Sequence, residues 1–217
     1  MRARPHNLPG NTVFLNIPYD DAFCRLYVAY ITGSVYLGLD PHATIEVPSG
    51  RNRLEKILEL IRSCRYSIHD LSRVQLDRTR PRTPRFNMPF ELGLVVAAAE
   101  IDSAGEGTKG EERRDLRDSW FVFESMRHRL AKSLSDLGGT DPHIHDGTIE
   151  GVMRTLCDAF KRPSSNERNS VKGMMKTYRA VSRELKEIER ETRAKSLFEP
   201  SVFRLLCAAA RAASRSL

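Results

Sequence analysis

The chain has 217 residues, of which 40% are hydrophobic and 29% charged, and its formal net charge at pH 7 is +7. These proportions are typical of a globular protein and exclude a disordered chain, and the length favours one core with an appended element. No apolar run approaches the roughly 18 residues that cross a bilayer, so we expect a cytoplasmic protein without membrane contact. The four cysteines are far apart and form no C-x-x-C pair, which favours reduced thiols over a zinc or redox site.

Short β-rich runs alternate with segments of helical periodicity through the first 125 or so residues. The pattern predicts strands at 12–16, 44–47, 66–70 and 119–123, and helices at 21–37, 54–65 and 87–100. This βαβαβαβ alternation predicts a flavodoxin-like α/β fold, in which a parallel sheet carries helices on both faces. Charged or proline-rich stretches at 71–84 and 102–118 are predicted loops, and the first of them is long enough to be a lid or a binding loop.

The remaining chain is predicted to be helical. We expect helices at 128–137, 148–160, 171–195 and 202–214, with a linker at 161–169. The chain therefore divides into an α/β domain, 1–160, and a helical extension, 161–217. The extension holds 14 Lys and Arg residues against 6 Asp and Glu residues, so it could bind a nucleic-acid-containing or acidic protein partner. A solvated helical face explains the same charge equally well.

Three segments are expected to meet at one edge of the sheet, because ligands of open parallel sheets bind at the carboxyl ends of the strands. The first strand is followed by Asn16-Ile-Pro-Tyr19-Asp20, and the third by His69-Asp70-Leu-Ser72. The third helix opens with Arg85-Phe-Asn87-Met-Pro-Phe-Glu91-Leu-Gly93. These segments supply the candidate site residues.

Glu91 is the most informative of these residues, because the helix around it is otherwise apolar. We expect it in the first turn, where the helix dipole and the free N–H groups keep a carboxylate ionised and directed at the crevice. A simple capping role is the alternative for Glu91, and Asp70 could likewise cap the turn after its strand. His69 is more simply explained as a core histidine. The run from Ser49 to Arg53 could bind an anion or only cap a helix.

The order of strand, Asp-Leu-Ser, arginine-rich loop and Phe-Asn-x-Pro-Phe-Glu-Leu-Gly resembles the nucleoside 2-deoxyribosyltransferase superfamily and its TIR-like nucleotide-hydrolase relatives. In those proteins an acid-Leu-Ser stretch at a strand end is followed by Asn-Val-x-x-Glu-Leu-Gly at a helix start. The resemblance covers about residues 13–99, and its specific part is the heptad 87–93.

The resemblance implies a role for each matching residue. Glu91 would be the carboxylate that faces the anomeric carbon of a ribose while the base departs, and Asp70 would hold the sugar hydroxyls. Asn87 would orient the helix start or the ligand. The remaining candidate substrate-binding residues are Asn16, Tyr19, Asp20, Ser72, Arg82 and Arg85.

Two departures from the family pattern bear on the substrate. The loop after the first strand reads Asn-Ile-Pro-Tyr-Asp, unlike the Ser-Tyr of TIR domains, and Arg85 stands where the transferases often have another acid. Because Arg82 and Arg85 could pair with phosphates, these departures favour a phosphate-bearing substrate over free nucleosides.

The leading hypothesis is therefore an N-glycoside hydrolase or ribosyl transferase that acts on a nucleotide such as NAD, with no cofactor. The extension would mediate homo-oligomer formation or docking. Some relatives are nucleotide-depleting effectors of bacterial defence, a role that reaches this chain by fold-level analogy alone. The alternatives are a nucleotide-sensing module without activity and a nucleic-acid-binding protein that acts through the basic extension. His143 and His145 lie in a loop with two acids, but without a third ligand at helical spacing they favour a pocket rim or a subunit contact over a metal site.

Overall fold

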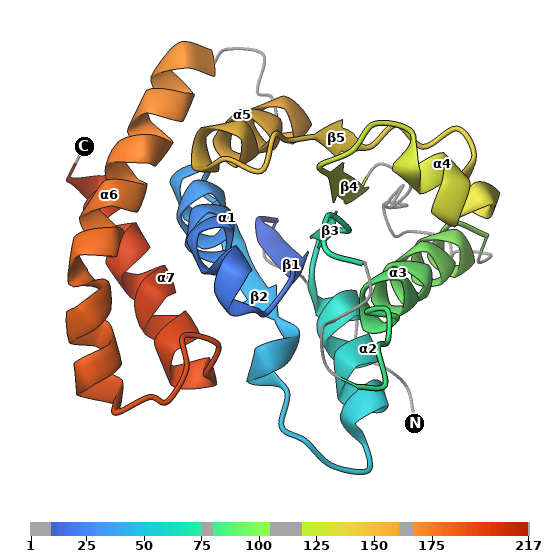
Figure 1. The fold of residues 1–217 in the computed structure, drawn as a ribbon, viewed down its shortest axis with the longest axis horizontal. Coiled ribbons are helices and arrows are strands. Elements are labelled where there is room, and N and C mark those ends of the chain that lie inside the picture. Colours follow the sequence, from blue (N-terminus) through green and yellow to red (C-terminus); the bar gives the residue numbers. More distant parts are fainter. Residues whose placement is uncertain (1–9, 75–79, 105–118, 161–166, 217) are drawn as a thin grey trace, which may run out of the picture.

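The computed structural model describes residues 10–74, 80–104, 119–160 and 167–216 (Figure 1). Parts of the loops expected at 71–84, 102–118 and 161–169 lie outside the described residues. No helix in the described ranges is long and apolar enough to cross a membrane.

The centre of the fold is a five-stranded sheet in which every pair of neighbours is parallel. Its order is β2-β1-β3-β4-β5, which confirms the flavodoxin-like α/β fold. The strands are β1 (Thr12–Asn16), β2 (Asp40–Ala43), β3 (Tyr66–Asp70), β4 (Trp120–Glu124) and β5 (His143–Ile144). The inner strands β1 and β3 are buried along almost their whole length, as expected of parallel strands covered on both faces.

Helices cover both faces of the sheet (Figure 1). One face packs against α1 (Cys24–Tyr36) and α5 (Ile149–Ala159) through Leu15, Ile68 and Phe123. The other face packs against α2 (Arg53–Ser63) and α3 (Asn87–Ala104), with the short α4 (Arg129–Ser133) beside α3. Successive side chains of a strand therefore enter different cores.

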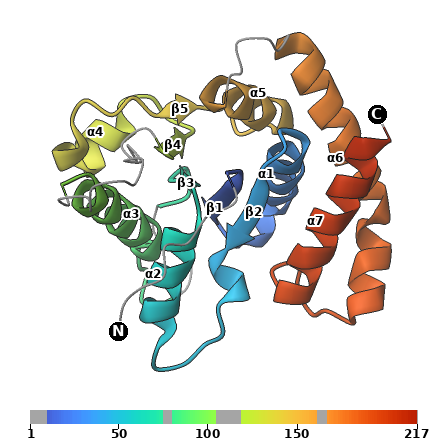
Figure 2. The same cartoon turned by 180° about the vertical axis from the view of Figure 1, so that it is seen from behind.

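The last two helices, α6 (Glu167–Thr192) and α7 (Pro200–Arg215), form a further layer on the outer side of α1 (Figure 2). Their apolar side chains, among them Met174, Val181 and Phe203, belong to the same core as α1 and β1. Every residue of α1 from Tyr27 to Val35 is buried as a result. The extension is therefore packed into the core of the α/β domain.

The sheet differs from the prediction in two ways. The second strand lies at 40–43 and not at 44–47, because Thr44–Glu46 turns into a 3-10 helix in which the Glu46 carboxylate accepts the Ala43 N–H at 3.2 Å. The strand β5 was not predicted, since two residues are too short to show periodicity. The helix predicted at 128–137 is also wrong, because α4 ends at Ser133 and a separate 3-10 turn follows at Ser135–Leu137. The other predicted strands and helices are present, with ends that differ by a few residues.

Candidate active site at the carboxyl edge of the sheet

The strand ends divide the candidate residues between the two faces of the sheet. His69 and Asp70 are consecutive in β3, so their side chains point to opposite faces. His69 lies on the α2–α3 side, with its ring 6.1 Å from that of Phe14. Asp70 lies on the α1–α5 side, where it meets Tyr30 of α1.

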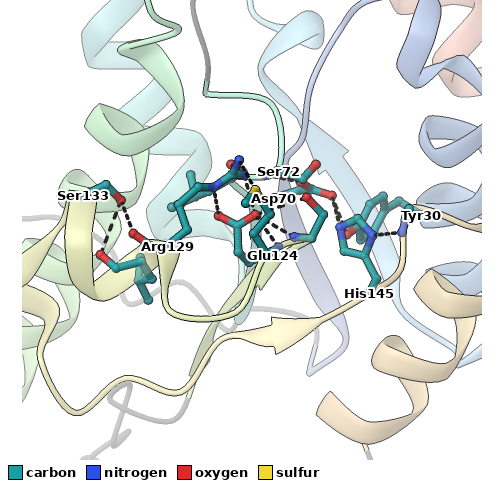
Figure 3. Close-up of polar contacts among 12 residues, drawn as sticks. Tyr30, Asp70, Ser72, Glu124, Arg129, Ser133 and His145 are labelled. Atoms are coloured by element: carbon teal, nitrogen blue, oxygen red, sulfur yellow. Dashed lines mark hydrogen bonds and ion pairs between the residues drawn. The ribbon is translucent and has the colours of Figure 1, made fainter.

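The Asp70 carboxylate is fully enclosed and bonded within the protein (Figure 3). Tyr30 donates its hydroxyl hydrogen to Oδ2 at 2.7 Å, and the Ser72 N–H donates to Oδ1 at 2.8 Å. The Nε2 atom of His145 lies 3.3 Å from Oδ2. Because His145 Nδ1 accepts the Gly147 N–H at 3.1 Å, the ring proton belongs on Nε2, the atom that faces Asp70.

A second buried acid, Glu124, ends β4 beside this group (Figure 3). Its carboxylate accepts the Ser125 N–H at 2.6 Å and Arg129 Nε at 2.7 Å. Arg129 also donates to the Leu71 carbonyl oxygen at 2.8 Å. The ion pair therefore ties the end of β4 to the chain leaving β3, which is a structural task.

Asn16, at the end of β1, connects the sheet to the start of α3. Its amide nitrogen donates to His69 Nδ1 at 2.9 Å and to the Met88 carbonyl oxygen at 2.8 Å. Burial lowers the pKa of His69 to about 3, so its imidazole is neutral at physiological pH. Both amide hydrogens of Asn16 are used inside the protein, so in this conformation neither is left for a substrate.

Glu91 is buried on the α2–α3 side, with 7% of its surface exposed. Burial raises its pKa to about 7, against the opposing effect of the Arg53 guanidinium nearby. Tyr19 is close enough for the charge of Glu91 to raise its pKa further, on top of the larger effect of burial. The Tyr19 hydroxyl lies 3.4 Å from that of Thr44, and Arg53 donates to the Thr44 carbonyl oxygen at 3.3 Å. Glu91, Tyr19 and Arg53 thus share one environment.

The expected position of Glu91 was wrong by one turn. The helix begins at Asn87, so Glu91 is its fifth residue and the first turn contains no acid. The free N–H groups of a helix start are therefore not available to its carboxylate. Burial dominates instead, and at neutral pH the group is close to half protonated rather than firmly ionised.

Asp20 is occupied by two arginines. Arg73 and Arg85 approach its carboxylate at 3.2 and 3.1 Å. Arg85, which was expected to bind a substrate phosphate, is thus paired with an acid of the protein itself. Arg82 and Asn87 are exposed, and the Asn87 amide nitrogen lies 3.8 Å from Met88 Sδ.

No hydrogen bond or ion pair joins Glu91 to Asp70 among the described residues. Asp70 is bonded to Tyr30 and Ser72, whereas the electrostatic neighbours of Glu91 are Arg53 and Tyr19. The expectation of one hollow shared by both carboxyls therefore finds no support. The residues whose charge or hydroxyl group interacts with Glu91 are Arg53 and Tyr19.

Sequence reasoning missed the residues that enclose Asp70 and Glu124. Tyr30 lies in the middle of an apolar helix and carries no signal of its role. Arg129 follows Glu124 by only five residues, and this short separation is the one signal in the sequence for their ion pair. His145 is buried beside Asp70, whereas His143 packs its ring 5.2 Å from that of Phe123. Within the described ranges no group of three or more His, Cys, Asp or Glu side chains is arranged to hold a metal ion.

Comparison of the chain with protein-family models, curated proteins and solved structures finds no match. The fold and the site define a flavodoxin-like α/β protein with buried acids at the carboxyl edge of its sheet.

Proposed function

We propose that this protein cleaves the bond between base and ribose in a nucleotide such as NAD, and that Glu91 is its catalytic carboxylate. One observation supports the proposal above the others. Glu91 is an acid with 7% exposure and a pKa near 7, without a hydrogen bond or ion pair to any described residue. A buried acid without a partner costs stability, so such groups are concentrated at functional sites.

The chemistry needs a negative charge near C1′ of the sugar. As the C1′–N bond breaks, its electron pair leaves with the base and C1′ becomes oxocarbenium-like. A carboxylate fixed in a desolvated position stabilises that positive charge more than it stabilises the ground state. Water then adds to C1′ and gives its proton to the Glu91 carboxylate, which releases the proton to solvent. In a transferase, an acceptor hydroxyl takes the place of the water.

The state of the other acids bears on the substrate. Asp70 is enclosed by Tyr30 and His145, and Asp20 is paired with two arginines, so neither is free to protonate a leaving base. A base that is already cationic, as nicotinamide is in NAD, leaves as a neutral molecule and needs no acid. With Glu91 assigned to the charge at C1′ and with Asp70 and Asp20 occupied, the described acids favour a nucleotide with a cationic base.

The role expected for Asp70 changes accordingly. Its carboxylate has no exposed surface, so we assign it to the internal network rather than to the sugar hydroxyls. Tyr19, whose pKa is raised by burial, keeps its proton at physiological pH and can donate it in a hydrogen bond to the substrate.

The test is to incubate the purified protein with NAD, nucleotides and nucleosides and to follow the released base by chromatography. We expect release from NAD, and a loss of at least about a hundredfold in Glu91→Gln. Glu100→Gln is the matched control, because Glu100 is an exposed acid of the same helix. Since Glu91 acts as a carboxylate, kcat/KM should rise with pH around a midpoint near 7.

Two results would contradict the proposal. Base release that persists in Glu91→Gln would place the chemistry elsewhere. Saturable nucleotide binding without any release, unchanged in Glu91→Gln, would identify a sensing module instead.

A further inference from the structure

A row of six basic side chains lies along the exposed side of α6 and is called the α6 row here. It consists of Lys172, Lys176, Arg179, Arg183, Lys186 and Arg190. The spacings alternate between four and three residues, which keeps all six on one side of the helix. All six are exposed, and at 1.5 Å per residue the row is about 27 Å long.

The charge of the α6 row is largely free. Within the described part of the chain, only Arg190 of the row has an ion-pair partner, Glu187 on the preceding turn. The arginines of α7 behave differently, since Arg211 pairs with Asp40 and Arg204 lies 3.9 Å from Glu46. The basic charge of α7 is thus partly neutralised against the sheet, whereas that of α6 faces solvent.

A hollow between α5 and α6 extends this positive surface. Its volume is about 580 Å³, and it is lined by Glu150, Arg154, Val171, Lys172, Met175, Lys176 and Arg179. Arg154 of α5 pairs with Glu150 at 3.1 Å, so these two charges offset each other. The remaining charged side chains of the lining are all basic, which makes the hollow positively charged: Lys172, Lys176 and Arg179. The α6 row therefore begins at this basic hollow. It continues along α6, a helix on the outside of the molecule (Figure 1).

Two kinds of partner fit this surface poorly. A membrane-binding helix inserts its apolar side between lipids, but Met174, Val181 and Ile188 of α6 are buried in the protein core. A protein interface needs an apolar centre, and the large exposed hydrophobic side chains found in the described ranges all lie outside α6. A polyanion with little apolar surface is the better match.

The side chains that α6 exposes also indicate whether the nucleic acid is single-stranded or double-stranded. Proteins that hold single strands stack the bases on exposed aromatic rings, and α6 exposes no such ring among its described side chains. A straight line of cations on a rigid helix matches the regular phosphates of a duplex, which carries one charge per about 1.7 Å of axis.

We propose that the α6 row binds the phosphate backbone of double-stranded nucleic acid without reading its sequence. The surface lies on the outer layer of the molecule and includes none of the residues around Glu91. The inference is therefore independent of the proposed cleavage reaction, and Glu91→Gln should bind the duplex like the wild type.

The test measures fluorescence anisotropy of a labelled 24-base-pair duplex, prepared once as DNA and once as RNA, across a range of salt concentrations. The test variant is Lys176→Gln/Arg179→Gln/Arg183→Gln. The matched control, Lys56→Gln/Arg62→Gln/Lys132→Gln, removes the same charge from exposed positions elsewhere. We expect wild type and control to bind at least one duplex. The test variant should bind it about tenfold or more weakly, and its slope of log K against log salt should be smaller by about 3.

Three results would overturn the proposal. The first is no binding of either duplex by the wild type at 50 mM salt. The second is an equal loss of affinity in both triple variants, which would show that only the net charge matters. The third is tighter binding of poly-glutamate or of anionic phospholipid vesicles than of either duplex. Circular dichroism of both variants, with spectra like the wild type, establishes that they are folded.

Discussion

Among single residues, Glu91 is a buried acid with a clear chemical use in the proposed reaction. Tyr19 and Arg53 are near enough to interact with its charge, and its burial favours the protonated form. The network around Asp70 is the opposite case, because there a buried acid has three polar neighbours and serves the fold. Two buried carboxyl groups thus differ in their partners, and the proposed use of each follows from its surroundings.

The pKa of Glu91 makes stability depend on pH in a defined direction. Below its ordinary pKa of 4.5 the Glu91 carboxyl is protonated in both the folded and the unfolded chain, so it adds no pH dependence to the free energy of unfolding. Between 4.5 and about 7 only the unfolded chain loses the proton, so the free energy of unfolding falls as pH rises. Above pH 7 the folded chain also carries the ionised Glu91, and the full cost of burying this charge lowers the free energy of unfolding.

Glu91→Gln should therefore be more stable than the wild type at pH 8, by on the order of 2 kcal/mol, with little difference at pH 4.5. Urea unfolding at a series of pH values measures the change, and Glu100→Gln should track the wild type throughout. A difference between Glu91→Gln and wild type that does not vary with pH would show that the carboxylate is not held as described.

Among the elements, close helix packing depends on two glycines. Gly33 of α1 faces Leu156 of α5, and Gly173 of α6 faces Tyr36 of α1. A Cβ atom at Gly173 would lie 2.0 Å from the Tyr36 hydroxyl oxygen and 2.6 Å from a ring carbon. The ring would have to move, so the contact between α1 and α6 has no room for a methyl group.

Gly173→Ala should accordingly destabilise the protein by about 1–3 kcal/mol through overpacking. Gly93→Ala is the opposite control, because Gly93 lies in α3 with no atom within 4 Å of an added Cβ. It should stabilise the helix by about 0.5–1 kcal/mol. Thermal or chemical unfolding of the two variants compares them directly, and stabilisation by both would refute the close contact with Tyr36.

Much of the fold could be predicted from the sequence because β1 and β4 are largely apolar runs and β3, although it contains Ser, His and Asp, lies between two helical segments. The strand β2 was misplaced because it reads Asp-Pro-His-Ala, which has no apolar periodicity and is ordered by pairing with β1. The site was predicted less well. The candidate acids Glu91 and Asp70 are both buried, but Asp70 is bonded to internal partners that the sequence did not indicate. The partners of Asp70 come from distant helices and loops, which only the tertiary structure brings together.

At the scale of the whole molecule, α1 is the centre of a layered structure. The sheet covers one side of it, α5 lies beside it, and α6 and α7 cover the rest. A helix that is buried all round needs each of these neighbours. The helical extension therefore completes the core.

A chain that ends at residue 160 should consequently fail to fold cooperatively. It would leave the outer side of α1 exposed and lose the buried side chains of α6 and α7. We expect insoluble expression, or a soluble product that has lost its near-ultraviolet circular dichroism while keeping helical signal. A truncated protein with a cooperative thermal transition would show instead that residues 1–160 fold independently.

The two edge strands of the sheet, β2 and β5, are poorly suited to pairing with a strand from another molecule. At one border β2 is four residues long and contains a proline, and Arg211 is bound to its Asp40. At the other border β5 has only two residues. Neither offers a template on which a foreign strand could extend the ladder. Copies of this protein that associate should therefore meet through helical surfaces, and samples stored at high concentration should not seed amyloid-like fibrils while they remain native.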